Sequence, residues 1–115
     1  MPSDPNNTAG QPNIRSEFAS DPDMQEIIGL FVQEMPERIA QLQSSWTSGE
    51  FDAVKRLAHQ LKGAGGGYGF PTLGQAAGKL ESSVNTLVNN SHGTELNGIK
   101  AQLDALVELC NRVAA

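Results

Sequence analysis

The sequence is poor in cysteine and in aromatic residues: it has one Cys, one Trp, one Tyr and four Phe among 115 residues. The single cysteine, Cys110, cannot form a disulfide within the chain, and we expect it to be a small buried residue in a reducing compartment. With so few aromatic side chains, any hydrophobic core must be mainly aliphatic. The length suffices for one domain with one modest core.

Positive charge and long apolar runs are also scarce. Eight Lys and Arg stand against 13 Asp and Glu, which gives a net charge of −5. This balance argues against nucleic-acid binding, because nucleic-acid-binding proteins need dense positive charge to displace counterions, and it disfavours a membrane-surface role. No apolar run approaches the roughly 20 residues of a membrane span. The start, MPSDPNNTAGQPN, lacks the apolar core of a signal peptide, so we expect a cytoplasmic protein.

The composition divides the chain into two parts. Residues 1–15 are rich in Pro, Asn, Ser, Gly and Asp, and are predicted to be disordered. Residues 16–115 show helical periodicity in four successive stretches and are predicted to form one domain. A short extra helix over residues 14–18 is predicted before them. Four amphipathic helices with short connections predict an all-α, antiparallel up-down-up-down four-helix bundle.

Cap and turn residues indicate where these helices begin and end. Asp21 is a helix cap with Pro22 in the first turn, and Ser48-Gly49 ends that helix. Pro36 falls inside it and is predicted to kink the helix rather than end it. The second helix runs from about Glu50 to a left-handed Gly69, Pro71 opens the third helix, which ends at Asn89-Asn90, and His92 lies in the turn before the fourth. The positions predicted to face inward are Met24, Ile28, Phe31, Met35, Ile39, Leu42 and Trp46, then Phe51, Val54, Ala58, Leu61, Gly65 and Tyr68, then Leu73, Ala76, Ala77, Leu80, Val84 and Leu87, and finally Leu96, Ile99, Leu103, Leu106, Cys110 and Val113.

Residues 59–69 read HQLKGAGGGYG, with five glycines in seven positions after a His and a Lys. A phosphate-binding loop would need GxxxxGK[ST] after a strand, but here the Lys precedes the glycines and the segment before them is helical. GxGxxG fails for want of a strand. Gly63, Gly65, Gly66 and Gly67 therefore lie on the helix, where each costs about 1 kcal/mol relative to Ala. Gly65 continues the inward stripe and is predicted to permit the close approach of a neighbouring helix.

The other glycines of this run lie on the outward face with the histidine. Gly63, Gly66 and Gly67 come four, seven and eight residues after His59. The outward face is formed by Lys55, Arg56, His59, Lys62, Gly63 and Gly66. Helix surface without side chains would let another protein come close to His59, and the three basic residues would attract a partner rich in carboxylates or carrying a phosphoryl group. On these residues alone, a solvated histidine without a role remains the alternative.

Other chemistry finds little support in the sequence. His59, His92 and Cys110 lack the spacing of metal ligands, so no metal site is predicted. There is no GxSxG motif, and the one cysteine falls on an apolar stripe, so nucleophilic hydrolysis is not predicted either.

The segment Ala58-His59-Gln60-Leu61-Lys62-Gly63 resembles the signature of histidine-containing phosphotransfer (HPt) domains, the four-helix carriers of phosphorelays. The resemblance includes Gly69, ten positions after the histidine, and the later pair Leu80-Glu81. The stretch FVQEMPERIAQL with its Gly-containing turn is similar to the preceding helix of that family. The similarity covers about residues 21–113. The run from Gly65 to Gly67 departs from the Ser/Ala-dominated stretch usual in the family.

The resemblance implies roles for individual residues. It implies that His59 takes a phosphoryl group on Nε2 from a receiver-domain aspartate and passes it to another receiver. By the same match, Lys62 would steady the phosphoryl group, Gly63 would clear space for the receiver, and Glu81 would hydrogen-bond the other ring nitrogen. The docking surface expected around the histidine comprises Lys55, Arg56, Gln60, Gly66 and Gly67.

The resemblance also implies the partners: receiver domains and a hybrid sensor histidine kinase. We expect no cofactor in this chain, because the Mg²⁺ of the reaction would sit on the receiver. Nothing in the sequence resembles an ATP-binding kinase domain, so we expect a phosphocarrier rather than an enzyme, and a monomer, because the reactive face must be free. The alternative is a docking or inhibitory module that binds receiver or kinase domains without carrying a phosphoryl group. The presence of both His59 and Lys62 favours the carrier.

Overall fold

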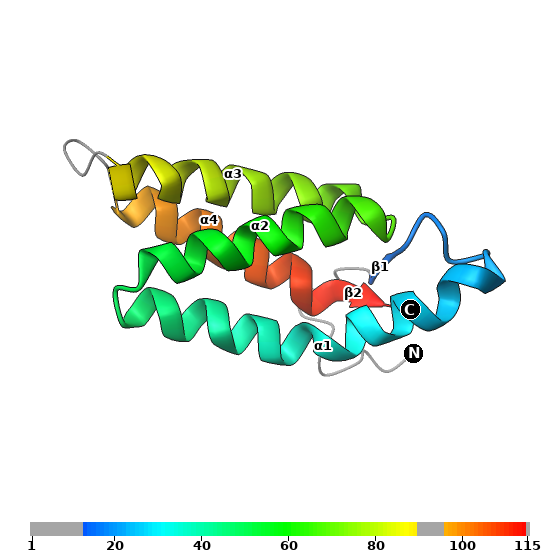
Figure 1. Ribbon diagram of the computed structural model, residues 1–115. Coiled ribbons are helices and arrows are strands. Elements are labelled where there is room, and N and C mark those ends of the chain that lie inside the picture. The colour runs from blue at the N-terminus through cyan, green and yellow to red at the C-terminus, as the bar shows by residue number, and fades with distance from the viewer. Residues whose placement is uncertain (1–12, 90–95, 115) are drawn as a thin grey trace, which may run out of the picture.

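Four helices account for most of the residues that the computed structural model describes, which are 13–89 and 96–114 (Figure 1). The elements are β1 (Ile14–Arg15), α1 (Pro22–Thr47), α2 (Phe51–Gly67), α3 (Pro71–Asn89), α4 (Leu96–Arg112) and β2 (Val113–Ala114). In Figure 1 each helix starts at the end of the bundle where the preceding helix finishes. The predicted all-α four-helix bundle is confirmed.

The helix ends lie where the cap residues predict them. The side chain of Asp21 accepts a hydrogen bond of 2.9 Å from the backbone N–H of Asp23, which satisfies one of the unpaired donors at the start of α1. The helix continues through Pro36 and ends before Gly49, whose φ of 74° suits a residue without Cβ. Gly69, with a φ of 83°, separates α2 from α3.

The core is mainly aliphatic, as the composition predicts. One contiguous cluster joins all four helices, and most of the positions predicted to face inward belong to it or pack against it. Leu96 is an exception: it is 48% exposed because it is the first residue of α4, at the end of the bundle. Phe70 was not predicted to be buried, yet it lies in the core, where its ring centroid is 5.7 Å from that of Phe31.

The N-terminal segment differs from its prediction. The extra helix predicted over residues 14–18 is wrong: Ile14 and Arg15 form β1, which pairs in parallel with Val113 and Ala114 of β2, and a turn follows. Long-range hydrogen bonds override the local helical pattern here, because the buried Ser16 donates its hydroxyl to the carbonyl of Tyr68. Of the segment predicted to be disordered, residues 1–12 lie outside the described residues, as does His92.

None of the helices within the described ranges is at once long enough and apolar enough to cross a membrane. Among the same residues, no group of three or more His, Cys, Asp or Glu side chains is placed to hold a metal ion.

Candidate functional site

The exposed face of α2 consists of two rows of residues at helical spacing. The first row borders α3, and we call it the α3-side row; it comprises Lys55, His59, Lys62 and Gly66. The second comprises Arg56, Gln60, Gly63 and Gly67, and we call it the α1-side row, because Gln60 lines a groove with Glu34, Glu37, Arg38 and Gln41 of α1. The outward face expected from the sequence therefore extends from the α3 contacts of His59 to the groove that Gln60 lines with α1.

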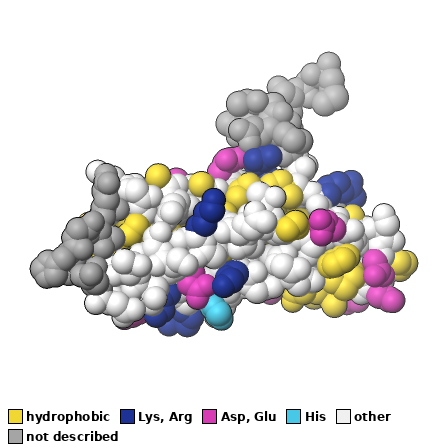
Figure 2. Space-filling view, turned by 90° about the horizontal axis from the view of Figure 1, so that it is seen from above, with side chains coloured by type: hydrophobic (Ala, Val, Ile, Leu, Met, Phe, Trp, Pro, Cys, Tyr) yellow, Lys and Arg dark blue, Asp and Glu magenta, His cyan; other side chains and the backbone are white. Residues whose placement is uncertain are grey.

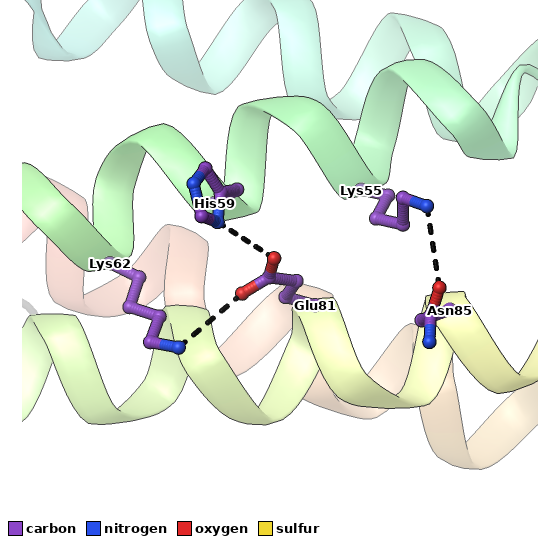
Figure 3. A network of polar contacts seen from close by, with 5 residues as sticks. All are labelled: Lys55, His59, Lys62, Glu81 and Asn85. Carbon is purple, nitrogen blue, oxygen red and sulfur yellow. Dashed lines mark hydrogen bonds and ion pairs between the residues drawn. The ribbon is translucent and has the colours of Figure 1, made fainter.

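His59 extends from the middle of α2 with 70% of its side chain exposed. Its Nδ1 atom is 2.8 Å from Oε2 of Glu81, which lies on α3. A carboxylate can only accept a hydrogen bond, so Nδ1 carries the proton and donates it. The neutral ring then has its free lone pair on Nε2, which lies on the side of the ring away from Glu81 (Figure 3).

The second oxygen of Glu81 faces Lys62. Nζ of Lys62 is 3.7 Å from Oε1 of Glu81, an ion pair between α2 and α3. Glu81 is only 23% exposed in its side chain, whereas Lys62 is 56% exposed. One carboxylate therefore orients the histidine and pairs with a lysine at the surface (Figure 3).

Lys55, one turn before His59 on α2, also contacts α3. Its Nζ donates to Oδ1 of Asn85 at 3.3 Å, and Nδ2 of Asn89 donates to the same oxygen at 3.2 Å. Asn85 is neutral, so this contact fixes the position of Lys55 without cancelling its charge. Figure 2 shows the resulting surface, with the imidazole projecting beside basic side chains and an acidic side chain.

The contacts between α2 and α3 follow a regular register, because the residue number on α3 rises as that on α2 falls. The paired residues are Gly65 with Gly74, Lys62 with Gly78, His59 with Glu81, and Lys55 with Asn85. The two helices therefore run in opposite directions. The closest approach requires glycine, since a Cβ on Gly65 would lie 2.7 Å from the backbone nitrogen of Gly74. This confirms the prediction that Gly65 permits close helix packing, and the resulting register places Glu81 opposite His59.

Three glycines beside the histidine have a different environment. Beyond the adjoining backbone of α2 itself, a Cβ on Gly63, Gly66 or Gly67 would meet no atom of the described part of the chain within 4 Å. These positions are bare helix surface, open to an approaching molecule on both rows of α2.

The sequence did not single out Gly78 and Asn85, which contact the basic side chains of the α3-side row. The signal was present: Gly74, Gly78, Glu81 and Asn85 are spaced four, three and four residues apart, which is one stripe of a helix. That stripe lies next to the apolar stripe of α3 and contains no large apolar residue, so its contact with α2 was not evident from hydrophobic periodicity.

Comparison with protein families finds a match to the Hpt domain over residues 26–114. Curated proteins and solved structures yield no significant match. The matched residues include all of α2, α3 and α4, most of α1, and the His59, Lys62 and Glu81 side chains. The chain therefore belongs to the Hpt domain family, whose members carry phosphoryl groups on histidine in two-component phosphorelays and work with receiver domains and histidine kinases.

Proposed function

We propose that this protein is a phosphorelay intermediate in which His59 is the phosphorylated residue. His59 receives a phosphoryl group from the aspartyl phosphate of a receiver domain, such as that of a hybrid sensor histidine kinase. It then passes the group to the aspartate of a second receiver. The observation that carries this proposal is the exposed ring whose Nδ1 is held by Glu81 at 2.8 Å, which leaves Nε2 free as the nucleophile.

The transfer step balances without any further group from this chain. The lone pair of Nε2 forms a bond to phosphorus, the bond between phosphorus and the aspartate oxygen breaks, and its electron pair remains on the aspartate carboxylate. The ring keeps its Nδ1 proton, so the phosphorylated ring carries a positive charge. Glu81 faces that proton and stabilises the charge. The reverse sequence of bond changes delivers the group to the second receiver.

Neighbouring residues contribute charge and space. Lys62 would turn its ammonium group from Glu81 towards the phosphoryl oxygens on the imidazole, because a doubly charged group attracts it more strongly. Gly63 leaves the helix surface beside His59 open, so that the receiver can approach closely. Phosphoryl transfer depends mostly on such positioning and on charge neutralisation, and the Mg²⁺ of the reaction is supplied by the acidic site of the receiver.

The docking surface in this proposal extends along both rows of α2. Lys55 and Arg56 attract the acidic rim of the receiver, while Gln60, Gly66 and Gly67 lie beneath it. Hpt domains are phosphocarriers rather than kinases. We propose a monomer that acts in the cytoplasm without a cofactor of its own, since the face around His59 must stay accessible to two partners in turn.

The test is phosphoryl transfer from a panel of phosphorylated receiver domains in the presence of Mg²⁺, with mass spectrometry of the modified residue. We expect an acid-labile, base-stable phosphate on His59 that is absent from His59→Gln. A folded chain that binds a receiver and takes no phosphoryl group from it would replace this proposal with the docking or inhibitory module.

A further inference from the structure

Gly78 lies in the interior of α3, one turn before Glu81, and faces the side chain of Lys62. A Cβ on Gly78 would lie 3.5, 3.7 and 3.8 Å from Cδ, Cε and Cγ of Lys62. The aliphatic stem of Lys62 therefore lies directly over the backbone of α3, and its ammonium group emerges beside Glu81 (Figure 3).

Gly74 and Gly78 of α3 both face α2, but Gly74 faces its backbone and Gly78 faces a side chain. A Cβ on Gly74 would be 3.2 Å from the carbonyl oxygen of Lys62 and 3.3 Å from the backbone nitrogen of Gly66, so helix packing itself restricts that position. At Gly78 the nearest atoms belong to a flexible side chain and lie at ordinary van der Waals distances. Helix packing does not require glycine at position 78, and the space beside it is occupied by the stem of Lys62.

From this contact we propose that Gly78 is a positioning residue for phosphoryl transfer, acting through Lys62. The bare backbone at Gly78 gives the lysine stem a surface on which to lie, and this holds Nζ near Glu81 and within reach of a phosphoryl group on His59. The inference rests on the proposed function of His59 and Lys62. It adds to the residues that act in transfer one residue of α3 that touches neither the phosphoryl group nor the imidazole.

Packing against Gly78 matters for the position of the Lys62 ammonium group because lysine is a flexible residue. Its four-carbon stem loses considerable rotamer freedom when the ammonium group is fixed in one place. The 3.7 Å separation of Nζ and Oε1 is longer than a direct hydrogen bond, so the ion pair alone holds the ammonium group loosely. Packing of the stem against α3 restricts the lysine before the receiver arrives and leaves less freedom to be lost during transfer.

The test uses Gly78→Leu, which fills the space of the stem, and Gly78→Ala, which the van der Waals distances tolerate. Gly29→Leu is the matched control, since Gly29 is also inside a helix and a Cβ there would meet no described atom within 4 Å. Single-turnover transfer is measured against the concentration of phosphorylated receiver. We expect Gly78→Leu to lower the maximal rate about tenfold or more, the effect of losing one charge-assisted hydrogen bond, while the half-saturating concentration changes by less than about twofold. Gly29→Leu should keep the wild-type rate, and Gly78→Ala, whose small side chain only touches the lysine stem, should fall between the wild type and Gly78→Leu.

A double-mutant cycle separates action through Lys62 from a general effect on α3. In the Lys62→Ala background, Gly78→Leu should cause no further loss of rate. The carbon-13 resonance of Lys62 Cε, which requires no phosphoryl transfer, should shift in Gly78→Leu and stay near its wild-type position in Gly29→Leu. If Gly78→Leu does not fold, Gly78→Met, with a more flexible side chain, serves in the same cycle.

The outcomes distinguish the two proposals. If the wild type accepts phosphoryl groups but the losses from Gly78→Leu and Lys62→Ala are additive, the positioning role is overturned and the proposed function stands. An unshifted Lys62 resonance in Gly78→Leu would overturn it as well. If the wild type accepts no phosphoryl group from any receiver, the proposed function fails and the role of Gly78 fails with it.

Discussion

The carboxylate of Glu81 on α3 holds Nδ1 of His59 on α2 at 2.8 Å, across 22 positions of sequence. This contact orients the ring and determines which nitrogen carries the proton. Glu81→Ala should lower the maximal transfer rate about tenfold, because both the preferred tautomer and the stabilisation of the charged phosphorylated ring are lost. Nitrogen-15 NMR of the His59 ring should show one neutral tautomer in the wild type and a mixture in the variant.

A suitable control for Glu81→Ala is Glu108→Ala, which removes an acidic residue of α4 that pairs with Arg112 at 3.0 Å. We expect this control to transfer at the wild-type rate. The transfer rate of Glu81→Gln should fall between those of Glu81→Ala and the wild type. An amide oxygen still accepts the hydrogen bond from Nδ1–H but carries no charge. A rate in Glu81→Ala equal to that of the wild type would contradict the orienting role.

Lys62→Ala should impair transfer without impairing the fold. Lys62 is largely exposed, so its ion pair with Glu81 contributes little to stability, and the free energy of unfolding should change by less than about 0.5 kcal/mol. Loss of a charged donor to the phosphoryl group should lower the maximal rate about 10- to 100-fold. Urea denaturation and single-turnover transfer measure the two effects.

Lys100 provides the comparison for Lys62, since its Nζ is 2.8 Å from Oδ1 of Asp104 on α4, in another exposed ion pair. Lys100→Ala should leave the transfer rate unchanged. Equal losses in the two variants would indicate that net charge, rather than the position of Lys62, is what the receiver senses.

The helices could be predicted from the sequence because their signals are local. Asp21 at the start of α1, Gly49 after it and Gly69 after α2 act through their own backbone and near neighbours, and the apolar stripes follow helical periodicity. The family signature likewise lies within one helix, from Ala58 to Gly63. Predicting these features does not require knowing which elements pack together.

The features that the sequence did not predict all depend on long-range contacts. β1 exists because Ile14 pairs with Val113, and Ser16 is buried because its hydroxyl meets the carbonyl of Tyr68. The role of Gly78 depends on the register between α2 and α3, which two separate periodic patterns leave undetermined. The groove that Gln60 lines with residues of α1 likewise depends on how α1 packs beside α2.

Cys110 should make the stability of the protein depend on pH in alkaline solution. Burial raises the pKa of the Cys110 thiol from the ordinary value of 9.0 to about 12, and the charge of Arg38 opposes this only in part. Well below pH 9 the thiol is protonated in both the folded and the unfolded chain, so it adds no pH dependence. Between pH 9 and about 12 only the unfolded chain loses the proton, which lowers the free energy of unfolding by at most about 1.4 kcal/mol per pH unit.

Urea denaturation of the wild type and Cys110→Ala between about pH 8 and about pH 10.5 isolates this effect, because the variant lacks the ionisable group. The stability of the wild type relative to the variant should stay constant up to about pH 9 and decrease above it. A difference that stays constant over the whole range would show that the thiol ionises equally in the folded and unfolded states.

Gly65→Ala should destabilise the bundle, although alanine is the better helix former. Its Cβ would lie 2.7 Å from the nitrogen and 2.9 Å from Cα of Gly74, and both are backbone atoms that can move only if α2 and α3 separate. We expect a loss of about 1–3 kcal/mol in the free energy of unfolding, as for other overpacked sites. Gly67→Ala near the end of the same helix, where a Cβ meets no described atom within 4 Å, should instead be neutral or stabilise the protein by up to about 1 kcal/mol. Equal effects of the two variants in urea denaturation would contradict the close approach.

Gly63→Leu should weaken receiver binding while the protein stays at least as stable as the wild type. A Cβ on Gly63 meets no described atom within 4 Å, so a leucine is tolerated by the fold and improves helix propensity. The same side chain would project from the surface one turn after His59, where the receiver must approach for direct transfer. We expect the dissociation constant for a receiver, measured by calorimetry, to rise at least about tenfold, equivalent to about 1.4 kcal/mol. Gly29→Leu carries the same substitution on α1 instead of α2, and we expect it to bind as the wild type does. Unchanged binding by Gly63→Leu would place the receiver on another face of the bundle, and the open glycines of α2 would then have no part in docking.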